Sequence, residues 1–286
     1  MEIKVSLKFS LFFFLTTLLC LTGCKKSDRD PQKGDIKVIG HGGGGFETIF
    51  HPLPANTMES IEKAIREDDA DGIEIDIQLS ADDILVLFHD KTLDKKTDCT
   101  GTVRSYSFTE LQGCNFHGDH KLSGGDHKIV SLEQVFTALA DIAPSKYFYL
   151  NIKPDAEENS ELYLDILSRK LANIIERHGL KNNTIIETPD MNLLMKIRER
   201  DSTLILMRDI GLFENDFKAI VEHDLDGIVV AKENITAEQV KEAQAAGKIV
   251  VIYGIRSAAS IKKVLNMYPD VVQTDRVSRT KRLKGE

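Results

Sequence analysis

The sequence predicts an α/β fold, a (β/α)8 or TIM barrel in which eight parallel strands close on themselves inside a ring of helices. Two observations support this fold class. Short apolar segments rich in Ile and Val alternate with helical patterns from residue 36 to residue 286, as expected for strands buried on both faces of a parallel sheet. The composition also shows no break between these repeats, which favours one domain over two. An open, doubly wound sheet is the alternative.

Nine segments match the strand pattern, although the barrel needs eight. The extra segment lies either within residues 72–89, where the sequence SADD makes a tight turn without an intervening helix, or among the last two segments. The nine segments are residues 36–40, 72–79, 84–89, 146–153, 183–188, 202–207, 227–231, 248–254 and 270–275.

Capping residues mark the helix boundaries between these segments. An N-cap side chain with its partner three residues later is found at Asn56 and Glu59, at Ser131 and Gln134, and at Thr236 and Gln239. Two further helices end near Gly179 and Gly247. Residues 91–130 contain no strong strand pattern, so they are expected to form a long loop with a short helix near residues 109–112.

The composition limits the possible partners. The chain has 286 residues, 42% of them hydrophobic, and a formal net charge of -8. This acidic balance argues against nucleic acid as a partner, because phosphate backbones attract basic surfaces. A small phosphorylated molecule held by a local basic residue and a metal ion is compatible with it.

Residues 1–23 have the pattern of a lipoprotein signal peptide. A basic start with Lys4 and Lys8 precedes an apolar stretch at residues 9–21, shorter than the roughly 20 residues that span a bilayer. The stretch ends in LTGC, which resembles the bacterial lipobox, so Cys24 is expected to carry a lipid and residues 24–35 to form a flexible tether. The protein is therefore expected in the bacterial cell envelope, outside the cytoplasm and attached to a membrane. An ordinary signal peptide cleaved elsewhere is the alternative.

The remaining cysteines fit an exported protein. Cys20 leaves with the signal peptide, and Cys99 and Cys114 remain as an even pair in an oxidising compartment. A disulfide between them is expected, and two buried free thiols are the alternative.

A pair of acidic residues lies on one face of the second predicted strand. Glu74 and Asp76 are two residues apart, so both point to the same side, while the isoleucines beside them suggest burial of the other side. Two carboxylates held side by side repel each other, and a hard cation is the usual remedy. The pair is therefore predicted to bind a metal ion; exposed positions on an edge strand are the alternative.

Other polar side chains end neighbouring strands, where barrel enzymes carry their chemistry. His41 and His89 end two different segments and are predicted to do acid–base work, with a structural role as the alternative. Asn151 and Lys153 end the fourth segment, and Lys153 is predicted to contact an anion rather than lie on the surface. Glu187, at the end of the fifth, is a weaker candidate. The other histidines are expected to be solvated or capping residues, unless residues 117–127 reach the site: His51, His117, His120, His127, His178 and His223.

Together these motifs resemble the glycerophosphodiester phosphodiesterases, whose domain is a (β/α)8 barrel of the PLC-like phosphodiesterase type. Family sequences begin with His-Arg-Gly, continue with Pro-Glu-Asn-Thr, Glu-x-Asp, His-Asp and Glu-x-Lys, and close near Thr-Asp. The corresponding residues, within roughly residues 37 to 277, are His41-Gly42-Gly43, Pro54-Ala55-Asn56-Thr57, Glu74-Ile75-Asp76, His89-Asp90, Asn151-Ile152-Lys153 and Thr274-Asp275.

The resemblance implies metal-dependent hydrolysis of a small glycerophosphodiester to glycerol 3-phosphate and an alcohol. It implies that His41 and His89 are the acid and base, that Lys153 steadies the phosphate, and that Ca2+ or Mg2+ is held by Glu74, Asp76 and Asn151. A phosphodiesterase acting on phosphoinositide or choline lipids is one alternative. A non-catalytic binding protein on the same scaffold is another.

Three positions depart from the family pattern. The arginine after the first histidine is Gly42, the glutamate before Asn56 is Ala55, and the third acidic metal ligand is Asn151. An amide oxygen binds Ca2+ or Mg2+ but brings no charge. Glu47 or Glu187 is the candidate replacement for the missing ligand.

The four glycines that follow His41 allow two interpretations. Without an arginine at position 42, the N–H groups of residues 42–45, with Gly42 and Gly43 first, could form an anion-binding nest for the phosphate. The alternative is a flexible loop packed by Phe46 and Phe50.

Overall fold

The computed structural model describes residues 36–45, 52–117, 126–153 and 161–285. The predicted signal peptide and tether, Cys24, Glu47, Phe46 and Phe50 lie outside these residues. Within the described ranges, no helix combines the length and the apolar character that crossing a membrane requires.

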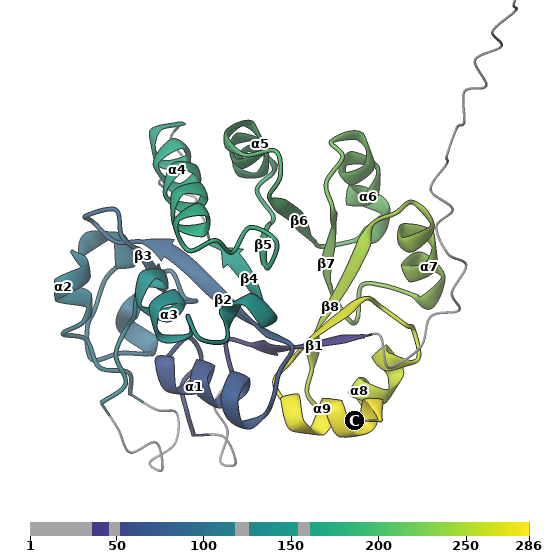
Figure 1. The fold of residues 1–286 in the computed structure, drawn as a ribbon, viewed down its shortest axis with the longest axis horizontal. Helices are drawn as coiled ribbons and strands as arrows, with labels where there is room; N and C mark the ends of the chain where they lie inside the picture. Colours follow the sequence, from purple (N-terminus) through teal and green to yellow (C-terminus); the bar gives the residue numbers. More distant parts are fainter. Residues whose placement is uncertain (1–35, 46–51, 118–125, 154–160, 286) are drawn as a thin grey trace, which may run out of the picture. The chain divides into compact units, whose positions relative to one another are not determined.

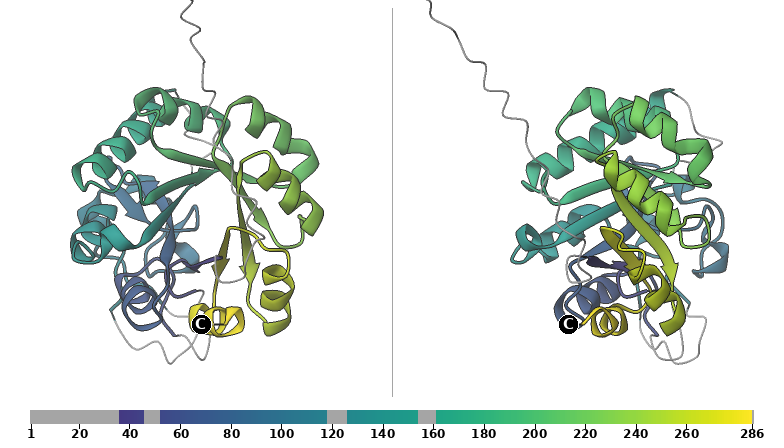
Figure 2. Two further views of the ribbon diagram at one scale, coloured as in Figure 1. Left: turned by 45° about the vertical axis from the view of Figure 1, so that its right-hand side comes forward. Right: turned by 90° about the vertical axis from the view of Figure 1, so that its right-hand side faces the viewer.

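Eight parallel strands close into a barrel, which confirms the predicted fold class (Figure 1). They are β1 (Lys37–His41), β2 (Gly72–Leu79), β4 (Tyr147–Ile152), β5 (Thr184–Thr188), β6 (Ile205–Ile210), β7 (Gly227–Ala231), β8 (Ile249–Ile255) and β9 (Val271–Thr274). Each strand pairs with the next in this order, and β9 pairs with β1 to complete the ring. Helices surround the strands on the outside (Figure 2).

The ninth strand, β3 (Leu85–Leu87), stays outside the ring. It pairs antiparallel with the end of β2, where Ile77 lies opposite Leu87. The turn between the two strands contains Asp83 with a positive φ of 60°. The extra segment therefore lies within residues 72–89, and both of the last two predicted segments are barrel strands.

Helices connect the strands and account for the predicted caps. Those of the described residues are α1 (Met58–Glu62), which a π-helical segment (Lys63–Glu67) continues, α2 (Phe108–Leu111), α3 (Leu132–Ala138), α4 (Glu161–Arg177), α5 (Met191–Arg200), α6 (Phe213–Glu222), α7 (Ala237–Ala245), α8 (Ala258–Leu265) and α9 (Val277–Lys284). The capping boxes predicted at Ser131 and Thr236 both form. The cap predicted at Asn56 is wrong by one residue, because Thr57 accepts the hydrogen bond from the Ser60 N–H.

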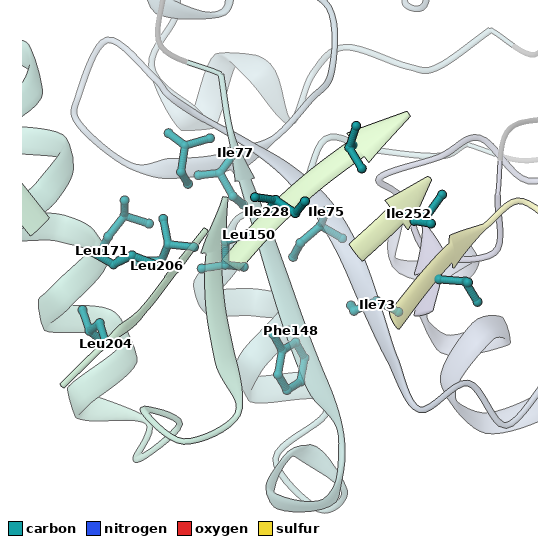
Figure 3. Packing of buried hydrophobic residues seen from close by; sticks show 14 of the residues in the cluster. Ile73, Ile75, Ile77, Phe148, Leu150, Leu171, Leu204, Leu206, Ile228 and Ile252 are labelled. Atoms are coloured by element: carbon teal, nitrogen blue, oxygen red, sulfur yellow. The ribbon is translucent and has the colours of Figure 1, made fainter. Parts of the chain in front are cut away.

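Alternation along β2 separates two apolar regions. Ile73, Ile75 and Ile77 point outward and belong to the large buried cluster between the strands and the helices (Figure 3). Glu74 and Asp76 alternate with them and face the barrel interior. Inside the barrel, a second apolar cluster lies closer to the amino ends of the strands than Asp76 does. Its buried residues are Ile39, Tyr149, Ile185, Met207, Val229, Val251 and Val271.

The chain between β3 and α3 is the long loop with a short helix that the sequence predicts, and it has a small apolar core of its own. Its described residues, 88–117 and 126–131, contain short helical turns, α2 and isolated bridges. Leu93, Val103 and Leu111 are among its buried side chains. Cys99 and Cys114 form the disulfide that the sequence predicts, with Cα atoms 5.5 Å apart.

Replacing both Cys99 and Cys114 by serine should lower the free energy of unfolding by about 3 kcal/mol, because the bridge closes a loop of 15 residues in the unfolded chain. Urea titration of the wild type, with and without a reductant, provides the comparison. The reductant should shift the wild-type midpoint and leave that of the double variant unchanged. Equal midpoints for the oxidised wild type and the variant would show that the bridge does not stabilise the fold.

Candidate functional site

The strand register gathers five predicted site residues on neighbouring strands. His41 at the end of β1 lies opposite Glu74 on β2, and Asp76 lies opposite Asn151 on β4. Asn151 in turn lies opposite Glu187 on β5. Paired residues of a parallel sheet point to the same side, so all five side chains face the interior at the carboxyl end of the barrel.

His41 is held between two carboxylates. Its Nδ1 lies 2.8 Å from Oδ1 of Asp275, and its Nε2 lies 3.8 Å from Oε2 of Glu74. Burial alone would lower the pKa of His41, but the charge of Glu74, the hydrogen bond to Asp275 and the charges of Asp275 and Asp76 outweigh burial and raise it to about 9. The imidazole is therefore cationic at neutral pH in the protein without a bound metal.

Asp275 was not among the predicted site residues, although it is the last residue of the closing Thr-Asp motif. It follows β9 directly and is buried. Its second oxygen accepts a hydrogen bond from Nε of Arg256. Burial would raise the pKa of Asp275, but its hydrogen bond to His41 and the charges of His41 and Arg256 lower it. Asp275 thus stays ionised and fixes the orientation of the His41 ring.

Glu74 is fully buried and only partly satisfied. Its Oε2 accepts a hydrogen bond of 2.9 Å from the Gly42 N–H, whereas its Oε1 has no hydrogen-bond partner. Burial and then the charge of Asp76 raise its pKa to about 7, against the opposing effects of His41, the Gly42 N–H and Lys153. A proton or a cation at Oε1 would satisfy this buried carboxylate.

Asp76 is hydrogen-bonded to Asn56, the residue that the sequence predicts as a helix cap. Asn56 has a positive φ of 65°, and its side chain makes two hydrogen bonds to Asp76. Its Nδ2 donates to Oδ2 at 2.8 Å, and its Oδ1 accepts the Asp76 N–H at 2.9 Å. These bonds fix the carboxylate and leave Oδ1 of Asp76 directed toward Lys153, whose Nζ is 3.3 Å away but makes no hydrogen bond to it of good geometry.

Lys153 is a basic residue that the end of β4 brings to this site. Burial would lower its pKa, but the charges of Asp76 and Glu74 raise it, so the ammonium group stays charged. In the structure it faces Asp76, which is compatible with a role in holding an anion above the carboxylates.

His89 lies on a loop that is fixed to β2. The Phe88 N–H donates to the carbonyl of Asp76 at 3.1 Å, and Nε2 of Gln78 donates to the carbonyls of Phe88 and Asp90 at 2.7 and 2.9 Å. The imidazole itself is 46% exposed, with Nδ1 2.7 Å from Oδ1 of Asp90. Gln78 was missed in the sequence, although it continues the inward-facing series of Glu74 and Asp76.

The structure does not support a phosphate nest at the glycine run, because protein acceptors already bind the N–H groups of Gly42, Gly43 and Gly44. The Gly42 N–H donates to the Glu74 side chain, the Gly43 N–H to the Glu74 carbonyl at 3.2 Å, and the Gly44 N–H to Ser60 at 2.9 Å. Gly42 and Gly43 therefore have no free donor for a phosphate. A Cβ at Gly43, which has a φ of 89°, would lie 2.9 Å from the Ile61 nitrogen, so this glycine permits close packing of the turn after β1 against α1.

Among the residues that the structure describes, four oxygens at the strand ends are buried without a hydrogen-bond partner. They are Oε1 of Glu74, Oδ1 of Asp76, Oδ1 of Asn151 and Oε1 of Glu187. In the part of the chain that the structure describes, no three His, Cys, Asp or Glu side chains are already gathered as a metal-binding group. A cation would therefore depend on the Asn151 amide as well as on the carboxylates. Oxygen-only ligands of this kind suit Ca2+ or Mg2+.

Asp209 on β6 adds another acidic side chain that sequence reasoning missed. Burial raises its pKa to about 6, with the charge of Lys153 opposing the shift. The apolar pattern of the sixth segment ends at Met207, whereas the strand itself continues to Ile210. Burial, followed by the charges of Glu74 and Asp209, raises the pKa of Glu187 well above its usual range. The interior is therefore rich in carboxylates.

Comparison with known proteins points to one family. A sequence model of the Glycerophosphoryl diester phosphodiesterase family matches residues 48–279. The chain is 24% identical to a glycerophosphodiester phosphodiesterase of Bacillus altitudinis, a match that covers 87% of this chain and 98% of that protein. It is 28% identical to Glycerophosphodiester phosphodiesterase 1 of Homo sapiens, over 59% of this chain and 47% of the relative. The chain thus spans about half the length of several of the curated relatives that it matches.

Solved structures share the barrel fold. A phosphodiesterase of Oleispira antarctica, in complex with the product sn-glycerol-3-phosphate, superposes with a TM-score of 0.75 at 21% identity, covering 86% of this chain and 96% of that one. A glycerophosphodiester phosphodiesterase of Parabacteroides distasonis gives a TM-score of 0.72 at 17% identity, with 87% and 97% covered. At these identities the likeness concerns the fold.

The interaction of His41 with Asp275 can be tested by measuring the pKa of His41 in protein freed of divalent cations. An NMR titration should give the His41 imidazole a pKa of about 9, and the variant Asp275→Asn should lower that pKa, because it removes the charge and hydrogen-bond acceptor at Nδ1. This raised pKa stabilises the folded state below the unfolded-state pKa of about 6.5. The stabilisation is lost as the pH rises through about 9. A wild-type pKa near 6.5 would contradict the ion-pair geometry.

Proposed function

Because the chain belongs to the glycerophosphoryl diester phosphodiesterase family, we propose that it hydrolyses glycerophosphodiesters to glycerol 3-phosphate and an alcohol. The observation that carries the proposal is the position of His41 beside the buried pair Glu74 and Asp76 at the carboxyl end of the barrel. The Oleispira antarctica neighbour, described with sn-glycerol-3-phosphate as its product, supports the same product here.

The family generally uses a divalent metal ion. In this chain Glu74, Asp76 and Asn151 would hold it, because each has a buried oxygen without a hydrogen-bond partner. The oxygen donors favour Ca2+ or Mg2+ as the ion. When bound, such an ion offsets the negative charge that develops on the phosphoryl oxygens.

His41 and His89 act in this proposal as the acid–base pair. One imidazole accepts the proton of the attacking water or glycerol hydroxyl, and the other donates a proton to the leaving alkoxide. Asp275 binds Nδ1 of His41, so that Nε2 is turned toward Glu74 and the proposed metal site. Lys153, kept charged by Asp76 and Glu74, contributes a positive charge to phosphate binding.

The departures from the family pattern at Gly42 and Ala55 favour a second candidate function. In it the same reaction is performed on a phosphodiester with another head group. A Cβ at Gly42 would lie 2.6 Å from that of Ala55, so the two small residues are neighbours beside His41. The family pattern has an arginine and a glutamate at these positions, and both charges are absent here. A panel of glycerophosphodiesters, phosphoinositides and choline lipids separates the candidates, since turnover of intact lipids alone would exclude the first.

Replacing His41 or His89 by alanine should reduce turnover by about 10²- to 10⁴-fold, because each substitution removes one proton-transfer group. The release of alcohol from a glycerophosphodiester, measured with and without a chelator, provides the assay, and the chelator should abolish activity in the wild type. The variant His223→Ala serves as a control, since His223 lies at the exposed end of α6. Full activity of both site variants would refute the assignment.

The site would act at a membrane surface if Cys24 carries a lipid, as we also propose from the LTGC motif. The variant Cys24→Ser should then move the full-length protein from the membrane fraction to the soluble fraction and leave its turnover of a water-soluble diester unchanged. Fractionation of cells that express either form provides the measurement. Equal membrane association of the two forms would count against lipidation at this residue.

A further inference from the structure

We infer that Glu187 is a metal ligand of the site, supplying the negative charge that Asn151 does not bring. The inference rests on the proposed function, because it concerns the same cation. Where the family motif has a glutamate, this chain has Asn151, so Glu74 and Asp76 are left with a neutral third partner. A divalent ion bound by those three residues alone would meet two negative charges instead of three.

Glu187 occupies the position from which that charge can be restored. It lies directly opposite Asn151 in the pairing of β4 with β5, so the two side chains are neighbours on the inner face of the barrel. Its side chain is fully buried, and its Oε1 has no hydrogen-bond partner. The unpartnered oxygens of Asp76, Asn151 and Glu187 thus belong to residues aligned across three adjacent strands.

A hydrogen bond across the barrel fixes the orientation of this carboxylate. Nε2 of Gln273 donates to Oε2 of Glu187 at 2.9 Å, although β9 and β5 are four strands apart in the ring and lie on opposite sides of it. Both side chains are buried. Gln273 is therefore a positioning residue, because it binds one oxygen of Glu187 and leaves the other available to a ligand.

A purely structural role for Glu187 does not satisfy its chemistry. An ionised carboxylate buried near Glu74 and Asp209 is costly, and the charge of Lys153 offsets only part of that cost. The hydrogen bond from Gln273 satisfies Oε2 and leaves Oε1 buried without a hydrogen-bond partner among the described residues. A cation satisfies both oxygens at once, as Gln273 keeps Oε2 and the ion takes Oε1.

The test is calorimetric titration of the full-length protein with Ca2+ and with Mg2+. The variant Glu187→Gln has the same shape and keeps an acceptor for Gln273, so it isolates the loss of charge and should weaken cation binding by about 10- to 100-fold. Asp209→Asn is the matched control. It also removes one negative charge from the barrel interior, but neither oxygen of Asp209 is among the four that lack a hydrogen-bond partner. We expect it to weaken binding by less than about threefold.

Rescue gives a second measurement that does not depend on the single variant. The double variant Asn151→Glu/Glu187→Gln returns the charge to the family position and should recover most of the wild-type affinity. Thermal unfolding in the presence of a chelator reports whether each variant folds. Addition of the cation should then raise Tm strongly in the wild type and the double variant, and weakly in Glu187→Gln.

Three outcomes would overturn the inference. Wild-type affinity in Glu187→Gln, an equal loss in Asp209→Asn, or no recovery in the folded double variant would each show that Glu187 is not a ligand. These failures are distinct from a failure of the proposed function, in which the wild type itself would bind neither cation and release no alcohol from glycerophosphodiesters. A wild type that binds the cation and turns over substrate, with Glu187→Gln unaffected, leaves the function intact and removes only this assignment.

Discussion

The burial of acidic side chains without enough positive charge is the constraint on which the rest of the site depends. The isoleucines of β2 commit its outer face to the apolar core, so Glu74 and Asp76 point into the barrel, where both are buried. Hydrogen bonds from Gly42 and Asn56 satisfy one oxygen of each carboxylate and leave the other without a hydrogen-bond partner among the described residues. The arrangement is costly for folding alone, and under the proposed function a cation at the remaining oxygens would offset that cost.

The fold could be predicted from the sequence nearly in full because its strands are buried on both faces. Such strands produce continuous apolar runs, and each of the nine predicted segments overlaps a strand in the structure. The missing helix between residues 79 and 85 correctly marks β3 as the strand outside the ring. The cap at Asn56 was misassigned for a local reason: the residue has the composition of a cap, but Asp76, twenty positions away, binds its side chain.

The carboxylate pair of the site could be predicted from residues close in sequence, whereas its partners from strands distant in sequence were missed. The motif that contains Glu74 and Asp76 is read directly from strand alternation. Asp275 reaches His41 from 234 positions away, and Gln273 reaches Glu187 from 86 positions away, which no local pattern encodes. The glycine run was misread for the opposite reason, since a sequence cannot distinguish backbone that approaches a ligand from backbone that packs against Ser60 and Ile61.

The pairing of β1 with β9 has a consequence for the newly made chain. While the protein is being synthesised, the paired residues of β2 and β3 emerge close together, because they are near each other in sequence. His41 gains the carboxylate that orients it only when the final strand and Asp275 have emerged. A nascent chain therefore holds most of the site's residues before the carboxylate that orients His41 has been made.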